Sequence, residues 1–163
     1  HFISGYTAKI AGTETNITEP KATFSACFGA PFLPLHPAVY AELLGKKMKE
    51  QNVSVWLINT GWIGGAYGTG ARIKLRYTRA IISAALNGGL NGVEFEKHPV
   101  FGVMMPKACP GVPEGLLNPR RTWTNKDAYD TQAKQLAGLY VNNFAKYKNA
   151  VANEILMAAP LAD

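Results

Sequence analysis

The stretch that most constrains this chain is a glycine-rich loop placed between an apolar run and a helical pattern. Five glycines fall between Gly61 and Gly70, within the segment TGWIGGAYGTGAR. The preceding residues, Ser54–Asn59, are apolar and β-branched, which predicts a buried strand. The following residues, Thr78–Asn87, carry helix formers with an apolar side and stop at a glycine pair, which predicts a helix. A strand, a glycine loop, a basic connector and a helix thus follow one another in the chain.

The rest of the chain predicts a mixed α/β protein. Its 163 residues suffice for one domain with a real core, so we expect a single domain over 1–163, built as a mixed sheet with flanking helices. The first residue is His1 rather than Met, which indicates a piece of a longer protein. Four further elements are expected: ordered turns and short strands around Phe24–Phe32, a helix from Pro37 with Val39, Leu43, Leu44 and Met48 on one face, a buried strand at Val100–Met105, and a long helix from Thr124 or Asn125 to about Lys148.

The net charge limits the expected partners of the chain, and its cysteines indicate the compartment. The formal net charge is +6, which favours anionic partners such as phosphorylated metabolites, nucleic acid or anionic lipid. Four basic residues cluster beside the glycine loop: Arg72, Lys74, Arg76 and Arg79. Cys27 and Cys109 lie far apart without a metal-ligand spacing, which favours a reduced, cytoplasmic pair. No apolar run approaches the roughly 20 residues of a membrane span, so no membrane partner is expected.

The glycine loop matches neither of the common phosphate-binding patterns. Gly65 and Gly70 have the Walker A spacing, but Ala71 and Arg72 replace the lysine and the hydroxyl residue that would hold β- and γ-phosphates and Mg²⁺. The dinucleotide fingerprint would need a helix directly after the glycines. The segment is therefore either an ordinary surface loop or one whose backbone amides approach an anion or a flat base.

Arg72 and Thr78, which both follow the loop, each have a structural and a functional interpretation. Arg72 offers a planar charged fork for a phosphate or a base, or is simply an exposed or ion-paired arginine. Thr78 caps the next helix, or presents its hydroxyl to a ligand.

Trp62, Tyr67 and Tyr77 near the basic cluster leave single-stranded nucleic acid as an alternative ligand. The three histidines show no metal-ligand spacing and are interpreted as structural or surface residues.

Several long motifs together resemble one enzyme family. They are SGYTAKIAGTE (Ser4–Glu14), TFSACFGAPFLPLHP (Thr23–Pro37), NTGWIGGAYGTGARIKL (Asn59–Leu75), YTRA (Tyr77–Ala80) and CPGVP…LNPRRTW (Cys109–Trp123). The chain resembles the ATP-dependent phosphoenolpyruvate carboxykinases essentially from end to end, with Ala71 where members often have lysine. The resemblance implies the C-terminal, mononucleotide-binding part of that fold.

The resemblance also implies an activity and a site. Members convert oxaloacetate and ATP to phosphoenolpyruvate, ADP and CO₂ in gluconeogenesis, with Mg²⁺ and usually Mn²⁺. Their phosphate loop, metal ligands and most substrate contacts lie upstream of the matching segment, so this chain is expected to contain no catalytic or metal-binding residue and to be inactive alone. Its expected nucleotide contacts are Arg72, Ile73 and Thr78, on the adenine and ribose side of ATP. Oxaloacetate and phosphoenolpyruvate would bind through the missing N-terminal part, and no nucleic acid is expected. A stand-alone nucleotide-binding module remains the alternative.

Overall fold

Contacts within the chain group its residues into two units in the computed structural model, which describes residues 1–9, 15–59 and 61–162. The first unit holds residues 1–55 and 136–162, and the second holds residues 56–135. The last part of the motif Ser4–Glu14 lies outside the described residues. The expectation of one domain over the whole length stays a prediction.

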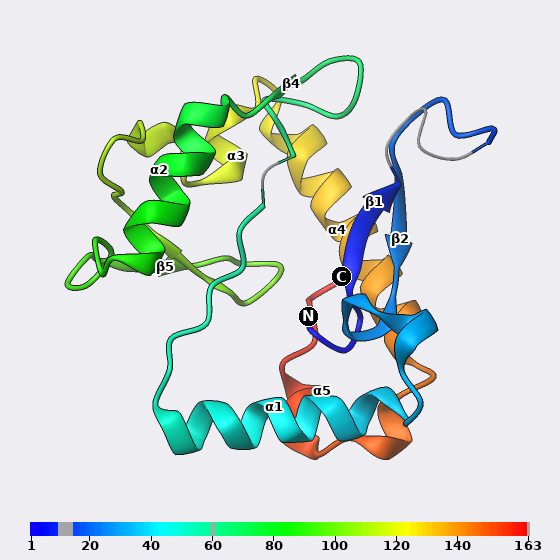
Figure 1. Cartoon of the computed structure of the whole chain (residues 1–163). Helices are drawn as coiled ribbons and strands as arrows, with labels where there is room; N and C mark the ends of the chain where they lie inside the picture. Colours follow the sequence, from blue (N-terminus) through cyan, green and yellow to red (C-terminus); the bar gives the residue numbers. More distant parts are fainter. Residues whose placement is uncertain (10–14, 60, 163) are drawn as a thin grey trace. The chain divides into compact units, whose positions relative to one another are not determined.

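The first unit combines the β1–β2 hairpin with helical segments (Figure 1). Its elements are β1 (Tyr6–Lys9), β2 (Lys21–Phe24), the 3-10 turns η1 (Ala26–Phe28) and η2 (Ala30–Phe32), α1 (Pro37–Gln51), the C-terminal part of α4 (Lys126–Phe144), η4 (Lys148–Ala150) and α5 (Asn153–Met157). Strands β1 and β2 are antiparallel, with Tyr6 opposite Phe24. Both rings pack on Tyr140 of α4, with centroid distances of 5.5 and 5.2 Å. Ile3, Ala26 and Tyr147 form the buried core of this unit.

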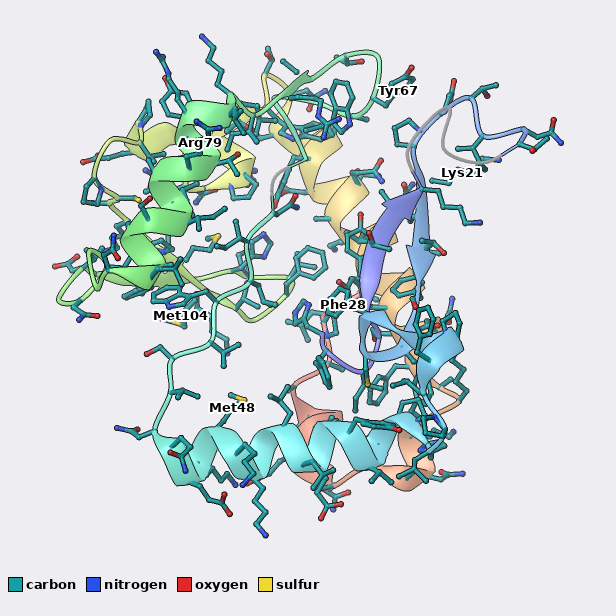
Figure 2. The ribbon with its side chains drawn as sticks, in the orientation of Figure 1. Lys21, Phe28, Met48, Tyr67, Arg79 and Met104 are labelled. Atoms are coloured by element: carbon teal, nitrogen blue, oxygen red, sulfur yellow. The ribbon has the colours of Figure 1, made fainter. Side chains whose placement is uncertain are left out.

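Helix α1 begins where the sequence predicts, but its apolar face is not covered by the described residues. Pro37 occupies the first turn, and the His36 imidazole Nδ1 accepts a hydrogen bond from the Ala38 amide at 3.3 Å. Leu43, on the predicted apolar face, is 53% exposed. Figure 2 labels Met48, the half-buried last member of the predicted face. Periodicity therefore identified the helix correctly, and part of its apolar face stays exposed among the described residues.

The second unit contains the glycine loop. Its elements are β3 (Trp62–Ile63), β4 (Ala71–Arg72), α2 (Leu75–Leu86), β5 (Phe95–Lys97), β6 (Met104–Pro106), η3 (Glu114–Leu116), α3 (Pro119–Thr122) and the first turns of α4. Its core consists of Ala84, Leu90, Cys109 and Val112, against which Tyr77 and other side chains of α2 pack. The mixed α/β class is confirmed. The described strands form three separate antiparallel pairs, β1–β2, β3–β4 and β5–β6, rather than the predicted mixed sheet.

The predicted strand at Ser54–Asn59 is not formed. The segment has no helix or strand hydrogen bonding, and Val55 and Leu57 are exposed. Only Trp56 is half-buried, where it packs against the core of the second unit. A strand exists only when a neighbour satisfies its backbone groups, and none of the described strands pairs with this segment.

The second predicted strand is displaced toward its C-terminus. It was expected at Val100–Met105, whereas β6 is Met104–Pro106. The His98 imidazole Nδ1 accepts hydrogen bonds from the amides of Val100 and Phe101, at 3.1 and 3.2 Å. These bonds hold both residues in a turn, so they cannot join the strand ladder.

The final helix begins at the predicted cap and ends earlier than expected. The Asn125 side chain accepts a hydrogen bond from the Ala128 amide at 3.0 Å, which makes Asn125, rather than Thr124, the capping residue. Helix α4 ends at Phe144 instead of Lys148. None of the helices among the described residues is long and apolar enough to cross a membrane.

Candidate functional site

The glycine loop is a narrow-necked turn on a short hairpin. Strands β3 and β4 pair antiparallel, with Trp62 opposite Arg72 and Ile63 opposite Ala71. The Gly70 amide donates to the Ala66 carbonyl at 2.7 Å, which folds the loop back on itself. A Cβ atom on Gly65 would lie 2.8 Å from the Gly70 nitrogen. Glycines are therefore required at the neck because the two backbones approach more closely than any side chain permits.

The three predicted nucleotide contacts lie in residues 72–78, the connector that follows the glycine loop. Arg72 ends β4 and is exposed, and the Ile73 amide donates to the Gly61 carbonyl at 3.1 Å, which extends the hairpin by one bond. Thr78 lies half-buried in the first turn of α2. Among the described residues, no hydrogen bond joins the Arg72, Ile73 and Thr78 side chains to one another: Arg72 ends β4, and Thr78 lies in α2.

Thr78 is not the helix cap that the sequence predicted. Helix α2 begins three residues earlier, at Leu75, and Lys74 occupies the cap position without a side-chain bond. The Thr78 amide instead donates to the Lys74 carbonyl at 3.3 Å, as an ordinary helical residue. Its hydroxyl is therefore not used as an N-terminal cap.

The connector carries positive charge without a nearby acidic residue in the sequence. Between Glu50 and Glu94 there is no Asp or Glu, whereas Arg72, Lys74 and Arg79 all lie in this interval. Among the residues that the structure describes, none makes an ion pair with Arg72. Of the two interpretations of Arg72 as a structural residue, ion pairing therefore has no support, and an exposed, available guanidinium is what remains.

Aromatic rings surround the connector. Trp62 and Tyr67 pack edge to face, with ring centroids 5.4 Å apart (Figure 2 labels Tyr67 in the loop and Arg79 on α2). The Arg76 guanidinium lies 4.6 Å from the centre of the Tyr77 ring and donates to its hydroxyl at 2.6 Å. Arg76 is thus held against its neighbour, whereas the side chains of Arg72, Lys74 and Arg79 have no hydrogen-bond or ion-pair partner among the described residues.

A cleft borders the glycine loop that sequence reasoning did not predict. It has a volume of about 260 Å³, and its lining residues are Gly64, Gly65, Ala66 and Thr69 of the loop with Trp123, Thr124, Asn125 and Ala128 at the start of α4. The sequence signal was present, since a tryptophan immediately precedes a capped helix, but no spacing rule relates residue 64 to residue 123. Only folding brings these two segments together.

The histidines and acidic residues do not form a second centre in the described part of the chain. His98 is buried, and its Nε2 lies 2.8 Å from the Tyr129 hydroxyl. Burial lowers the pKa of His98 and raises that of Tyr129. No group of three His, Cys, Asp or Glu side chains suited to a metal ion occurs among residues 1–9, 15–59 and 61–162. Both cysteines are free thiols.

Comparisons with known proteins agree on one family. A sequence profile of the family described as phosphoenolpyruvate carboxykinase matches residues 1–115. The protein "Phosphoenolpyruvate carboxykinase (ATP)" of Flavobacterium johnsoniae is 61% identical over 163 residues, which is all of this chain and 30% of that protein. The protein of the same name from Thermus thermophilus is 56% identical over 160 residues, 98% of this chain and 30% of that protein.

The similarity covers the whole candidate site. "Phosphoenolpyruvate carboxykinase (ATP) 1" of Moorella thermoacetica is also similar, at 61% identity over 149 residues, 91% of this chain and 28% of that protein. The chain thus spans about 30% of the length of these relatives. The profile match over 1–115 includes the glycine loop and all three predicted contacts. By this match, the chain belongs to the ATP-dependent phosphoenolpyruvate carboxykinase family.

Proposed function

We propose that this chain is the C-terminal, mononucleotide-binding part of an ATP-dependent phosphoenolpyruvate carboxykinase and supplies the adenine and ribose side of the ATP site. The observation that carries the proposal is the connector after the glycine loop. In this segment Arg72 is exposed and has no ion-pair partner among the described residues. The segment also lies within the region of similarity to relatives whose names include ATP. A guanidinium without an ion-pair partner can form hydrogen bonds to a phosphate or stack on a purine ring.

Each of the three residues has a distinct role in this proposal. Arg72 makes a charged contact to the nucleotide, because its guanidinium is always protonated and presents a planar fork. Ile73 offers apolar surface to the adenine ring. Thr78 offers a hydroxyl to the polar edge of the base, a role left open by its position inside α2 rather than at the cap. Together they bind and orient the nucleotide from its non-reacting end.

The reaction proposed for the complete protein is conversion of oxaloacetate and ATP to phosphoenolpyruvate, ADP and CO₂, in gluconeogenesis. Phosphoryl transfer depends on positioning and on charge stabilisation around the phosphates. Mg²⁺, with Mn²⁺ as the second ion, would supply that charge stabilisation when bound. No group of three His, Cys, Asp or Glu side chains suited to a metal ion occurs among the described residues, so the proposal assigns the metal ligands to the rest of the protein. The family resemblance implies the same for the oxaloacetate contacts.

A cytoplasmic location accompanies this proposal. It rests on the two free thiols, which are typical of a reducing compartment, and on the small-molecule substrates of the reaction. No membrane partner is part of the proposal.

Arg72→Ala in the full-length enzyme tests the nucleotide assignment. We expect the Kd for ATP to rise roughly 10- to 100-fold, because a hydrogen bond to a charged group contributes about 1.5–3 kcal/mol and 1.4 kcal/mol is a factor of ten. Calorimetric titration with ATP and with GTP measures this change and the base preference. Arg79→Ala is the matched control, since it removes the same charge from an exposed position on α2. Unchanged ATP binding by Arg72→Ala would refute the assignment.

Single-stranded nucleic acid is the second candidate ligand. The exposed ring pair Trp62–Tyr67 lies beside the cationic connector, and such pairs serve as stacking surfaces for bases. A salt-dependent gel shift with single-stranded DNA or RNA that ATP does not compete would favour this candidate over the carboxykinase nucleotide site.

A further inference from the structure

One hydrogen bond joins the glycine loop to the C-terminal end of α3. The Gly64 amide donates to the Thr122 hydroxyl oxygen at 3.0 Å, across 58 positions of the sequence. Gly64 is the first loop residue that lines the cleft, and Thr122 immediately precedes Trp123, the first lining residue of the opposite wall. The bond therefore connects the two walls of the cleft at one edge.

The Thr122 hydroxyl is committed to this bond by its second contact. It donates its own proton to the Pro119 carbonyl at 2.7 Å, so its lone pairs face the Gly64 amide. The approach is also close, because a Cβ atom on Gly64 would lie 3.3 Å from the Thr122 carbonyl oxygen. Gly64 has φ +77°, a conformation that glycine adopts without cost.

The corner that carries Thr122 is fixed by several independent bonds. The Arg120 guanidinium donates to both carboxylate oxygens of Asp130, each at 2.8 Å. The Lys126 ammonium donates to the carbonyls of Arg121 and Trp123, at 3.0 and 2.6 Å. The Asn118 side chain accepts from the Arg120 amide and donates to Glu96 in β5. Thr122 thus lies at the braced C-terminal end of α3, and its bond to Gly64 ties the glycine loop to this end of the helix.

We propose that Thr122 is a positioning residue, whose hydroxyl sets the place of the glycine loop and, through the β3–β4 hairpin, of Arg72. This inference rests on the proposed nucleotide site for its consequence in ATP binding. The loop is built from residues with little side-chain packing, so an external anchor decides which of its conformations is populated. An anchored loop binds ligand more tightly because less conformational entropy is lost on binding.

The test compares Thr122→Val with Thr122→Ser in the full-length enzyme. Valine keeps the shape of threonine without its hydroxyl, and serine keeps the hydroxyl. We expect Thr122→Val to exchange the Gly64 amide proton about five to ten times faster in the ligand-free protein, since one net hydrogen bond is lost. We also expect it to raise the KM for ATP by a similar factor with little change in kcat, which is the signature of lost ground-state binding. Thr122→Ser is expected to match wild type in both measurements.

The control is Thr131→Val, which removes a hydroxyl that bonds only to the Asp127 carbonyl within α4. It should leave the Gly64 exchange rate and the KM for ATP unchanged. If Arg72→Ala weakens ATP binding, faster Gly64 exchange without a change in KM in Thr122→Val would overturn the positioning role. Equal behaviour of the valine and serine variants would overturn it in any case. Failure of the nucleotide assignment is separate: it would show as normal ATP binding by Arg72→Ala, while Gly64 exchange in the absence of ligand still reports whether Thr122 holds the loop.

Discussion

At the scale of single residues, hydrogen bonds at both ring nitrogens fix the protonation form of His98. Nδ1 accepts from two backbone amides, so the proton of the neutral ring sits on Nε2, facing the Tyr129 hydroxyl. Protonation of the ring would place a second proton on Nδ1, which could then no longer accept the hydrogen bonds from the Val100 and Phe101 amides. Burial acts in the same direction and lowers the pKa of His98. The sequence interpretation of this histidine as structural agrees with this geometry.

The protein should lose stability in mild acid through His98. Its folded pKa lies below the unfolded value of about 6.5, so its contribution is complete above pH 6.5 and is lost as the pH falls from there toward the folded pKa. Urea unfolding at pH 7.5 and 5.5 measures the loss. His98→Asn, which keeps an acceptor near Nδ1 but does not titrate, should be less stable at pH 7.5 yet show a smaller difference between the two pH values. An equal pH difference in both proteins would contradict this account.

At the scale of elements, the hairpin neck decides whether the glycine loop forms. The loop closes through backbone contact between Gly65 and Gly70, with Ile63 and Ala71 pairing beside it. Sequence reasoning identified the loop from its glycines but not the strands that flank it, because β3 and β4 are two residues each and carry no alternating pattern. A pair of such short strands forms only because the neck brings them together.

Gly70→Ala should therefore open the neck. A Cβ atom there would lie 2.7 Å from the Ile63 carbonyl oxygen and closer still to that of Gly65, so the backbone must move. Overpacking of this kind costs about 1–3 kcal/mol, which corresponds to a fall in Tm of several degrees. Gly115→Ala is the control, since no atom lies within 4 Å of its Cβ position. Scanning calorimetry of both variants measures the difference, and equal Tm values would show that the neck is not tightly closed.

At the scale of the whole molecule, the chain corresponds to a part of its relatives, and the proposed function gives it one side of the nucleotide site. It spans about 30% of the length of its relatives, and its described residues include no metal cluster. Large apolar side chains are exposed in both units, among them Phe32 at 86% and Leu57 at 58%. These features fit a segment that contributes binding and orientation but no chemistry at the γ-phosphate.

The 163-residue chain alone should therefore form no ADP from ATP in response to oxaloacetate. A coupled assay with Mg²⁺ and Mn²⁺ present measures this, with the full-length enzyme as the positive control. Turnover near that of the full-length enzyme would mean that the catalytic groups lie within this segment, contrary to the proposal.

The sequence predicted the existence of helices α1, α2 and α4, though not all of their ends, and the position of the glycine loop, because these features depend on local rules. Pro37 starts α1, Asn125 caps α4, and the spacing of glycines marks the loop. The resemblance carried by the long motifs also identified the family, which the comparisons confirm.

Only the tertiary structure decided which residues meet. The cleft joins Gly64 to Trp123, and Thr122 bonds to Gly64, through contacts that no local spacing encodes. The strand predicted at Ser54–Asn59 was wrong for the same reason, because a strand is defined by its partner rather than by its own residues. Helices satisfy their backbone bonds within one segment and so follow from the sequence, whereas strands, clefts and anchors depend on distant segments and follow only from the fold.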